Sequence, residues 1–326
     1  MNAVKLGISI YSFAKEFYTG EYGIGDCIRR VADMGLDGIE IVGSQMVRGY
    51  PWPSDETIDD ILGMCDRHGV KLICYSSNSD FGIRSDRDLT EEELFEYGMH
   101  DLRAAARFGA KVMRVQYLMT APVMARLAPH AERLGIRVGV EMHSPESPST
   151  PTMQRFLKMF REVGSPNLGF VVDFGSFADK PNRFVVEKAL RDGAHPEIVA
   201  YMTRARYEGM PRGEVQTAAV AMGANDADLG LLSVFYSFTA FQKPDWLGLA
   251  EIMPHVVHCH GKFYALDPEN GDLDVSIPYD RILPLLRDNG FDGYIMSEYE
   301  SMDPERDTFD LLRRHTAMEA RILAST

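Results

Sequence analysis

The sequence predicts an α/β chain that closes into a (β/α)8 barrel, with a helical insertion between the sixth and seventh strands. This prediction rests on three observations: a repeated turn from helix to strand, the regular alternation of helices and strands, and one unusually long interval between two strands. Strands that alternate with helices favour a parallel sheet with right-handed crossovers, and eight such units can close on themselves. An open doubly wound sheet is the alternative, but no glycine-rich dinucleotide loop follows the first strand.

The turn from helix to strand is the most regular feature of the chain. In each copy a helical stretch ends at glycine and a β-rich run follows within a few residues, because glycine tolerates the left-handed conformation that closes a helix. The glycines of the six copies are Gly35, Gly69, Gly109, Gly135, Gly164 and Gly290. Together with an opening strand at 4–10 and a β-rich run at 255–260, these turns predict eight strands.

Helices are expected in the gaps, because apolar residues recur there at three- and four-residue spacing. Thr90 with Glu93, and Ser54 with Thr57, are typical of helix N-termini, where a hydroxyl group caps the first turn. The expected helices span 24–34, 55–68, 91–108, 122–134, 151–163, 279–289 and 306–323.

One interval between two predicted strands is much longer than a single helix and its loops require. Between Asp173 and His260 lie 86 residues, where one helix and its loops need about 30. We predict a single barrel domain over 1–326 with an insertion at 175–243 that lies over the C-terminal face of the barrel. Helical spacing at 183–207 and 226–241, with apolar runs in the second segment, suits a lid over a pocket or a surface that docks a partner. Extra helices packed on the outside are an equally weighted alternative.

Composition excludes several classes of partner. The chain is 45% hydrophobic and has a formal net charge of −14, without a basic run. This charge opposes a nucleic-acid or anionic-membrane partner, since both need Lys and Arg to replace counterions. No apolar stretch reaches membrane-spanning length, and a strand begins near the first residue without a signal peptide. The four cysteines form no CxxC pair, so we expect reduced thiols in a cytoplasmic protein.

Polar residues at strand ends mark the expected active site, because active sites of such barrels lie where the strands end. In the fifth strand Glu141 and His143 project together, since residues two apart on a strand share a face. The sixth strand ends at Asp173, although aspartate is a poor strand former and is costly to bury without a partner. These three residues predict half of a metal or acid–base site.

The seventh and eighth strands supply the other half of the predicted site. His258, His260 and Lys262 alternate along the seventh strand and therefore share one face. The eighth strand ends in Glu298, followed by Glu300 on the same face. His258 could support the site without binding an ion, and Glu300 could merely begin the next helix.

Three carboxylates and one imidazole from four consecutive strands predict a metal site, because such groups repel one another unless a cation lies between them. A single acidic strand end is more often a helix cap or an ion-pair partner, but four together favour the metal. Mostly oxygen ligands with one imidazole suit Mn²⁺ first, with Mg²⁺, Co²⁺ or Zn²⁺ as alternatives. The expected ligands are Glu141, Asp173, His260 and Glu298.

Over nearly its whole length the chain resembles the xylose isomerase-like TIM barrels of the sugar phosphate isomerase/epimerase group. The motifs that carry the resemblance are Leu6-Gly7-Ile8-Ser9, the Gly-Leu-Asp-Gly-Ile-Glu-Ile run ending at Ile41, the His-x-Lys of His260 and Lys262, and the strand-end residues Glu141, Asp173 and Glu298. The resemblance implies that Glu141, Asp173, His260 and Glu298 bind one divalent cation. The insertion at 175–243 departs from the family pattern and argues against a simple free-sugar epimerase.

Such a site favours proton transfer next to a sugar carbonyl. A metal bound to neighbouring sugar oxygens polarises the carbonyl and stabilises the enediolate left when the adjacent proton is removed. The resemblance implies that Glu141 and Glu298 also exchange this proton. His143 is a further candidate for general base, since an imidazole titrates near neutral pH, with a hydrogen bond to substrate as the alternative role. Lys262 is expected to stabilise oxyanion charge.

Five further residues are expected to hold substrate hydroxyl groups or an aromatic group. They are Glu40 on the second strand, Trp52 in a loop, Arg114 and Gln116 on the fourth strand, and His258. The absence of a phosphate-cradling glycine loop favours an unphosphorylated substrate.

Two reactions fit this chemistry. The main expectation is an isomerase or epimerase that acts on a sugar or keto-sugar. The alternative is the similar branch of C-glycoside deglycosidases, in which a catalytic barrel subunit with a small β-rich partner splits the carbon–carbon bond between an oxidised sugar and an aromatic aglycone. We therefore expect a homo-oligomer, or a hetero-oligomer with such a partner.

Two other classes are weighed as rivals. Endonuclease IV-type barrels share the architecture, but they need three zinc ions and a basic face that this acidic chain lacks. A non-catalytic sugar-binding barrel is the further alternative, although it would not need four residues of metal-ligand type.

Overall fold

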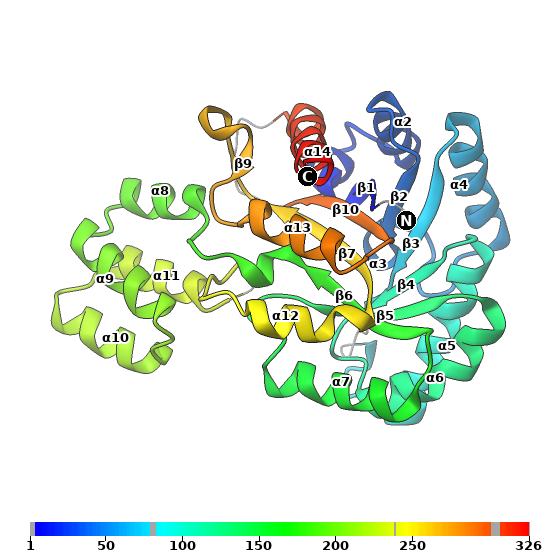
Figure 1. The fold of residues 1–326 in the computed structure, drawn as a ribbon, viewed down its shortest axis with the longest axis horizontal. Helices are drawn as coiled ribbons and strands as arrows, with labels where there is room; N and C mark the ends of the chain where they lie inside the picture. Colours follow the sequence, from blue (N-terminus) through cyan, green and yellow to red (C-terminus); the bar gives the residue numbers. More distant parts are fainter. Residues whose placement is uncertain (1–3, 79–82, 238, 301–306, 326) are drawn as a thin grey trace.

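The computed structural model describes residues 4–78, 83–237, 239–300 and 307–325. Eight parallel strands form a closed barrel in the order β1-β10-β7-β6-β5-β4-β3-β2, which confirms the predicted (β/α)8 class (Figure 1). The barrel strands are β1 (Lys5–Ser9), β2 (Gly38–Val42), β3 (Lys71–Ser76), β4 (Val112–Val115), β5 (Arg137–Met142), β6 (Leu168–Asp173), β7 (Val256–Phe263) and β10 (Tyr294–Tyr299). A small antiparallel hairpin, β8 (Leu266–Asp267) and β9 (Leu273–Asp274), follows β7.

Helices surround the barrel and connect its strands. They are α1 (Ala14–Tyr18), α2 (Ile24–Asp33), α3 (Gly43–Met46), α4 (Asp55–His68), α5 (Glu91–Arg107), α6 (Ala121–Leu134), α7 (Pro151–Val163), α12 (Trp246–Ile252), α13 (Tyr279–Asp288) and α14 (Thr308–Ala324). The last of these covers most of the predicted helix 306–323, whose first position lies outside the described residues.

Helix ends follow the local chemistry of the sequence. The Ser54 hydroxyl accepts from the Thr57 amide at 3.2 Å, and Thr90 with Glu93 forms a reciprocal capping box at the start of α5. All six turn glycines have a positive φ, between 65° and 78°, which a residue with a side chain rarely adopts. These turns return each helix to the start of the next strand.

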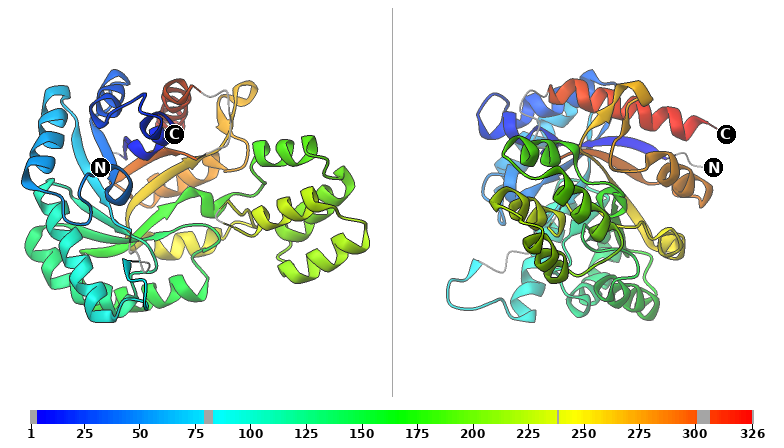
Figure 2. Two further views of the ribbon diagram at one scale, coloured as in Figure 1. Left: turned by 180° about the vertical axis from the view of Figure 1, so that it is seen from behind. Right: turned by 90° about the vertical axis from the view of Figure 1, so that its left-hand side faces the viewer.

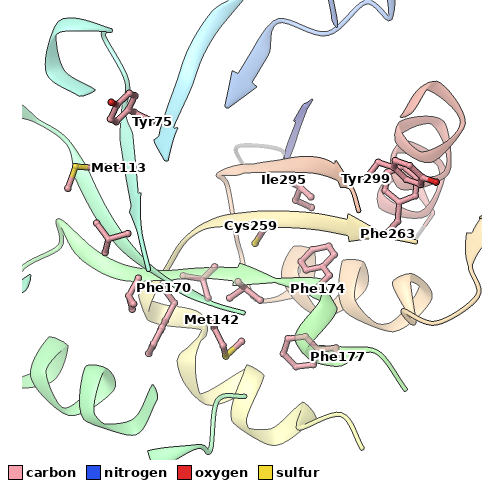
Figure 3. Close-up of a cluster of buried hydrophobic side chains, with 14 of the residues drawn as sticks. Tyr75, Met113, Met142, Phe170, Phe174, Phe177, Cys259, Phe263, Ile295 and Tyr299 are labelled. Carbon is pink, nitrogen blue, oxygen red and sulfur yellow. The ribbon is translucent and has the colours of Figure 1, made fainter. Parts of the chain in front are cut away.

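The apolar core lies between the barrel and its helices, and mostly aliphatic side chains fill it, together with aromatic and sulfur-containing ones. In the part drawn in Figure 3, Phe170 of β6 and Cys259 of β7 contribute to this layer. Cys259 is fully buried and points away from its neighbours His258 and His260, as the two-residue period of a strand requires. All four cysteines are buried and none forms a disulfide.

Strand register fixes the height of each polar residue in the barrel. Asp173 of β6 pairs with His260 of β7, and Glu298 of β10 pairs with Lys262 of β7. The carboxyl ends of these strands therefore bring two carboxylates, an imidazole and an ammonium group to the same end of the barrel.

Five α-helices of the described chain lie between β6 and β7, and the first four of them extend away from one side of the barrel (Figures 1 and 2). These four are α8 (Arg183–Arg191), α9 (Pro196–Tyr207), α10 (Arg212–Ala221) and α11 (Asp226–Phe235). The expected helix 183–207 is broken, because Gly193 with φ 99° ends α8 and Pro196 starts α9. Helix α10 was not predicted. The expected helix 226–241 stops at Phe235, short of position 238, which lies outside the described residues.

Among the helices of the described ranges, none has the length and hydrophobicity of a membrane-spanning segment.

A cluster of three buried polar side chains connects α14 to β10. His315 and Glu319 are fully buried, and both contact the Ser297 hydroxyl, at 2.9 Å from His315 Nδ1 and 2.8 Å from Glu319 Oε2. Although His315 lies on a helix, it is neither exposed to solvent nor a capping residue. Burial lowers the pKa of His315 to about 3 and raises the pKa of Glu319 to about 8. Both side chains are therefore neutral at pH 7.

We predict that Glu319→Gln makes the stability less dependent on pH. The folded pKa of Glu319 lies above its unfolded value, so its favourable contribution is complete below about pH 4.5 and is lost as pH rises through 8. Between these values the wild type should lose about 1.4 kcal/mol per pH unit relative to the variant. Urea unfolding at pH 5.5, 7 and 8.5 measures the difference. Parallel pH profiles of the two proteins would contradict the burial argument.

Candidate active site

A cavity of about 290 Å³ opens at the carboxyl ends of the strands. Six charged or ionisable residues line it, and all lie at or just beyond strand ends: Arg114, Glu141, His143, Lys262, Glu298 and Glu300. Tyr11, Val42, Gln45, Asn78, Gln116, Tyr117 and Leu118 complete the wall. None of these residues belongs to the 175–243 insertion.

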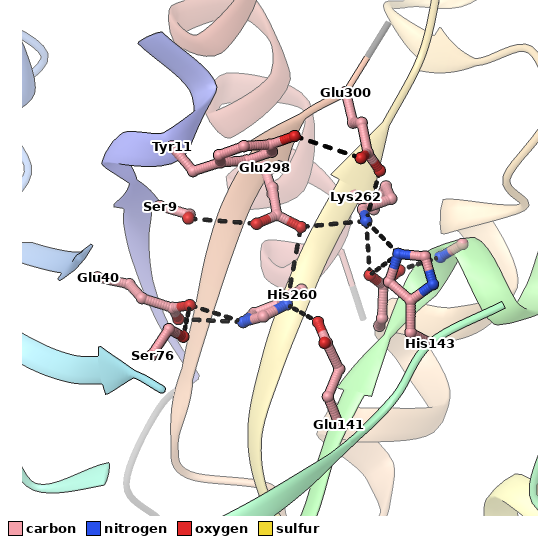
Figure 4. A network of polar contacts seen from close by, with 12 residues as sticks. Ser9, Tyr11, Glu40, Ser76, Glu141, His143, His260, Lys262, Glu298 and Glu300 are labelled. Atoms are coloured by element: carbon pink, nitrogen blue, oxygen red, sulfur yellow. Dashed lines mark hydrogen bonds and ion pairs between the residues drawn. The ribbon is translucent and has the colours of Figure 1, made fainter. Parts of the chain in front are cut away.

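His260 is fully buried directly beneath the lining residues Glu141, Lys262 and Glu298, with a carboxylate at each ring nitrogen (Figure 4). Its Nδ1 atom is 2.7 Å from Glu141 Oε1 and 3.7 Å from Glu298 Oε2. Its Nε2 atom is 2.9 Å from Glu40 Oε1. Burial opposes a charge on the ring, but these three carboxylates outweigh it and raise the pKa of His260 well above its usual range.

Lys262 occupies the next level of the cavity, two residues beyond His260. Its Nζ atom lies 2.9 Å from Asp173 Oδ2, 3.3 Å from Glu298 Oε2 and 2.7 Å from Glu300 Oε2. Burial would favour the neutral amine, but the charges of these carboxylates outweigh it and hold the pKa of Lys262 well above its ordinary value. The ammonium group therefore stays charged and compensates the buried Asp173 and Glu298 as well as the partly exposed Glu300.

Arg114 compensates the charge of Glu141 from the opposite side. The two side chains lie 3.3 Å apart and both are almost fully buried. The guanidinium also donates to the Ser77 carbonyl at 3.2 Å and to the Asn78 side-chain oxygen at 2.8 Å. Burial raises the pKa of Glu141, but Arg114 and His260 outweigh burial and lower it below its usual range. Burial dominates at Glu298 and raises the pKa of that carboxyl group.

His143 faces Lys262 across the cavity. Its Nδ1 atom lies 2.8 Å from the Ser144 carbonyl oxygen, and its Nε2 atom lies 2.9 Å from Lys262 Nζ. A carbonyl oxygen can only accept and an ammonium group can only donate, so Nδ1 carries the proton and the unprotonated Nε2 accepts a hydrogen bond from Lys262. This is the protonation pattern that a general base requires.

The residues predicted to bind a metal come together at the floor of the cavity. Ligand-type atoms of Glu141, Asp173 and His260 lie within 4.8 Å of one another, and Glu298 approaches the same His260 nitrogen. His260 Nδ1 and Asp173 Oδ2 are buried and make no well-aligned hydrogen bond, although charged partners lie close to both. Two carboxylates, together with an imidazole whose Nδ1 offers a lone pair when the ring is neutral, are a donor set that fits a divalent cation, which would replace the proton on Nδ1.

Three of the residues expected to bind substrate are not among those that line this cavity. Glu40 and His258 are fully buried below the cavity and do not line it. Both residues lie within their strands, before the carboxyl ends at which the cavity opens. Trp52 is 62% exposed and packs against His100, away from the cavity wall. Arg114 and Gln116 do line the cavity, as expected for residues that contact substrate.

Tyr11 is a cavity residue that the sequence reasoning missed. It follows β1 directly, in the short 3-10 helix Ile10–Phe13, and its hydroxyl group donates to Glu300 Oε1 at 3.4 Å. Burial, and then the charge of Glu300, raises the pKa of Tyr11 and keeps its phenol protonated. The rule that strand ends carry the site would have found Tyr11, had it been applied to the first strand.

Comparison with known proteins gives a consistent result. Residues 28–201 match the model of the family described as xylose isomerase-like TIM barrel. The chain is 35% identical to the 3'-dehydrocarminate deglycosidase alpha subunit of Microbacterium sp, over 91% of this chain and 88% of that protein. It is 32% identical to the C-glycoside deglycosidase alpha subunit of Microbacterium trichothecenolyticum, over 90% of this chain and 83% of that protein.

The fold is also similar to that of solved structures. A sugar phosphate isomerase/epimerase from Parabacteroides distasonis superposes with a TM-score of 0.58 at 15% identity, over 99% of this chain and 96% of that one. At this identity the likeness extends to the fold alone.

We predict that Arg114→Leu is strongly destabilising. The change leaves the Glu141 carboxylate buried without its guanidinium, and loss of one partner of a buried ion pair costs about 3–5 kcal/mol. Arg161→Leu is the matched control, because it removes a 2.9 Å ion pair with Glu251 in which both side chains are about half exposed. That change should cost less than about 1 kcal/mol. Equal losses in urea unfolding would contradict the assigned role of Arg114.

Proposed function

Because the chain belongs to the xylose isomerase-like TIM barrel family and to its C-glycoside deglycosidase alpha-subunit branch, we propose that it is the catalytic subunit of a C-glycoside deglycosidase. The chain is an enzyme that acts on sugar substrates. The proposed reaction breaks the carbon–carbon bond between a 3-keto sugar and an aromatic aglycone. The observation that carries the proposal is similarity over about nine tenths of the chain to alpha subunits that are named for deglycosidation.

We propose that a divalent cation, Mn²⁺ first among the candidates, is the cofactor. Glu141, Asp173, His260 and Glu298 would hold it at the cavity floor, where their donor atoms gather. When bound, such an ion supplies Lewis-acid polarisation of the sugar carbonyl. The remaining chemistry falls to side chains that line the cavity.

His143 is the proposed general base. His143 lines the cavity and its unprotonated Nε2 accepts a hydrogen bond from Lys262; once substrate displaces that bond, Nε2 would take the proton from the sugar carbon next to the keto group. The Lys262 ammonium group lies 2.9 Å from the same nitrogen, and it places positive charge where the oxygen of the resulting enolate would develop negative charge.

Elimination then completes the proposed reaction. The enolate electrons form a double bond between the deprotonated carbon and the anomeric carbon, and the bond from the anomeric carbon to the aglycone breaks with its electron pair on the aglycone carbon. That carbon takes up a proton, so the reaction needs no oxidant or reductant. Tyr11 is the proposed donor, because its protonated phenol lines the cavity on the side of Glu300.

The insertion is proposed as the docking segment for a second, small β-rich subunit rather than as a lid. No residue that lines the cavity comes from 175–243, and helices α8 to α11 extend to the side of the barrel (Figure 2). Val220 and Met222, at the end of α10, are 55% and 46% exposed and offer apolar contact area. The names of the relatives as alpha subunits support a hetero-oligomer.

Epimerisation is the second candidate, because Glu141 and Glu298 approach the same His260 nitrogen from two strands and could exchange a proton across a substrate.

A substrate test separates the two candidate reactions, C-glycoside cleavage and epimerisation. Incubation with a 3-keto aryl C-glucoside should release the aglycone, and a chelator should abolish release until Mn²⁺ is restored. D-Fructose should remain unchanged under the same conditions. Formation of a fructose epimer, with an intact C-glycoside, would overturn the lyase and favour the epimerase.

We predict that His143→Gln lowers kcat by about 10²- to 10⁴-fold, the usual contribution of a general base. Glutamine keeps a side chain of similar reach but cannot take the proton. Mn²⁺ affinity should change little, since His143 is not among the proposed ligands. Stopped-flow measurement of aglycone release and a Mn²⁺ titration test both parts. A loss of Mn²⁺ affinity with normal kcat at saturating Mn²⁺ would assign His143 to the metal site instead.

A further inference from the structure

Glu40 is a charged residue that the proposed reaction leaves without a role. It lies within β2, is fully buried and does not line the cavity, so it does not contact substrate. An ionised carboxylate at such a place is costly unless every oxygen is compensated. The contacts of Glu40 therefore indicate what it does.

Both oxygens of Glu40 accept hydrogen bonds from buried donors (Figure 4). Oε1 accepts from the Ser76 hydroxyl at 2.5 Å and lies 2.9 Å from His260 Nε2. Oε2 lies 3.0 Å from His258 Nε2 and 3.1 Å from His260 Nε2. A carboxylate can only accept, so both imidazoles present an Nε2–H group to Glu40. Burial raises the pKa of Glu40, but the charge of His260 and these hydrogen bonds lower it well below its usual range.

A hydrogen bond that fixes one nitrogen of an imidazole decides what the other nitrogen can do. Because His260 Nε2–H is held by Glu40, the ring plane is fixed and Nδ1 is directed at Glu141 and Glu298. Metal-binding histidines usually donate their second ring N–H to a carboxylate or carbonyl group in this way, and loss of that partner typically lowers metal affinity or activity 10- to 100-fold.

We propose that Glu40 is the positioning residue of the cation site: it holds His260 through Nε2–H so that Nδ1 is the ligand atom. The inference rests on the proposed function, since it concerns the same cation. His258 donates to the second oxygen of Glu40 from the same strand as His260, and Ser76 donates to the first. The carboxylate is thereby held on two sides and cannot rotate away from His260.

A second metal site is the rival explanation of the same cluster. Ligand-type atoms of Glu40, Cys74 and His258 lie within 4.8 Å of one another. However, all three residues are fully buried, and both Glu40 oxygens already accept hydrogen bonds from Ser76 and the two imidazoles. An ion at this place would have to break those bonds and share Glu40 with His260. The contacts favour a hydrogen-bonded support for the site above.

Mn²⁺ titration of the purified protein, followed by the electron paramagnetic resonance signal of the free ion, tests the proposal. Glu40→Gln should raise the Kd for Mn²⁺ by 10- to 100-fold, and excess Mn²⁺ should restore kcat. Glu319→Gln is the matched control, because it makes the same substitution at another fully buried glutamate outside the cavity, and its Kd should remain within twofold of wild type. Wild-type Kd in Glu40→Gln would overturn the proposal.

Two further measurements keep the test decisive if Glu40→Gln does not fold. Glu40→Asp retracts the carboxylate from His260 and should weaken Mn²⁺ binding more than Ser76→Ala, which leaves the carboxylate in place; the reverse order would overturn the proposal. In wild-type protein loaded with Zn²⁺, ¹⁵N NMR should find His260 protonated at Nε2 and coordinated at Nδ1, and the opposite pattern would also overturn it. A wild type that binds no Mn²⁺ or Zn²⁺ would instead refute the proposed metal-dependent function, and this inference with it.

Discussion

Compensation of buried negative charge is the constraint on which the rest of this structure depends. Carboxylates from four barrel strands meet at one end of the barrel, where almost no water reaches them, and their mutual repulsion would open the barrel if it were not balanced. His260, Lys262 and Arg114 supply the balance from inside: the first two each lie between several carboxylates, and Arg114 pairs with Glu141. The same balance leaves the donor atoms close enough together to take a divalent cation, so the demands of stability and of the proposed chemistry coincide.

The order of elements and the floor of the site could be predicted from the sequence because both follow short-range rules. Glycine closes six helices in the left-handed conformation, and a two-residue period tells which side chains share a face. Those rules predict that Glu141, Asp173 and His260 lie close together, as they do in the structure. They say which face a residue is on, but not how deep it lies along the barrel axis. At about 3.3 Å per residue, His258 lies about 6.6 Å below His260, and this distance separates a support residue from a candidate ligand.

Other features depend on long-range packing that no local pattern records. His315 has an ordinary helical position, yet α14 turns it toward β10, where Ser297 and Glu319 surround it. Helix α10 escaped notice because Pro211 and Gly213 read as turn residues, whereas proline at the N-cap and glycine in the first turn are compatible with a helix start. Tyr11 was missed because aromatic residues after a strand are common in cores, and only the cavity beside Glu300 distinguishes this one.

The alternation within β7 limits how this strand can change in evolution. His260 and Lys262 face the barrel axis, and His258 contacts Glu40 on the same side of the strand. Cys259 faces the surrounding core, and a side chain at Gly261 would collide with the Glu319 carboxyl group. Deleting or inserting a single residue before His258 would turn the polar set outward and drive a thiol and a glycine into the acidic floor. Length variation among homologous chains should therefore be absent from this strand and should collect instead in the peripheral helices that precede it.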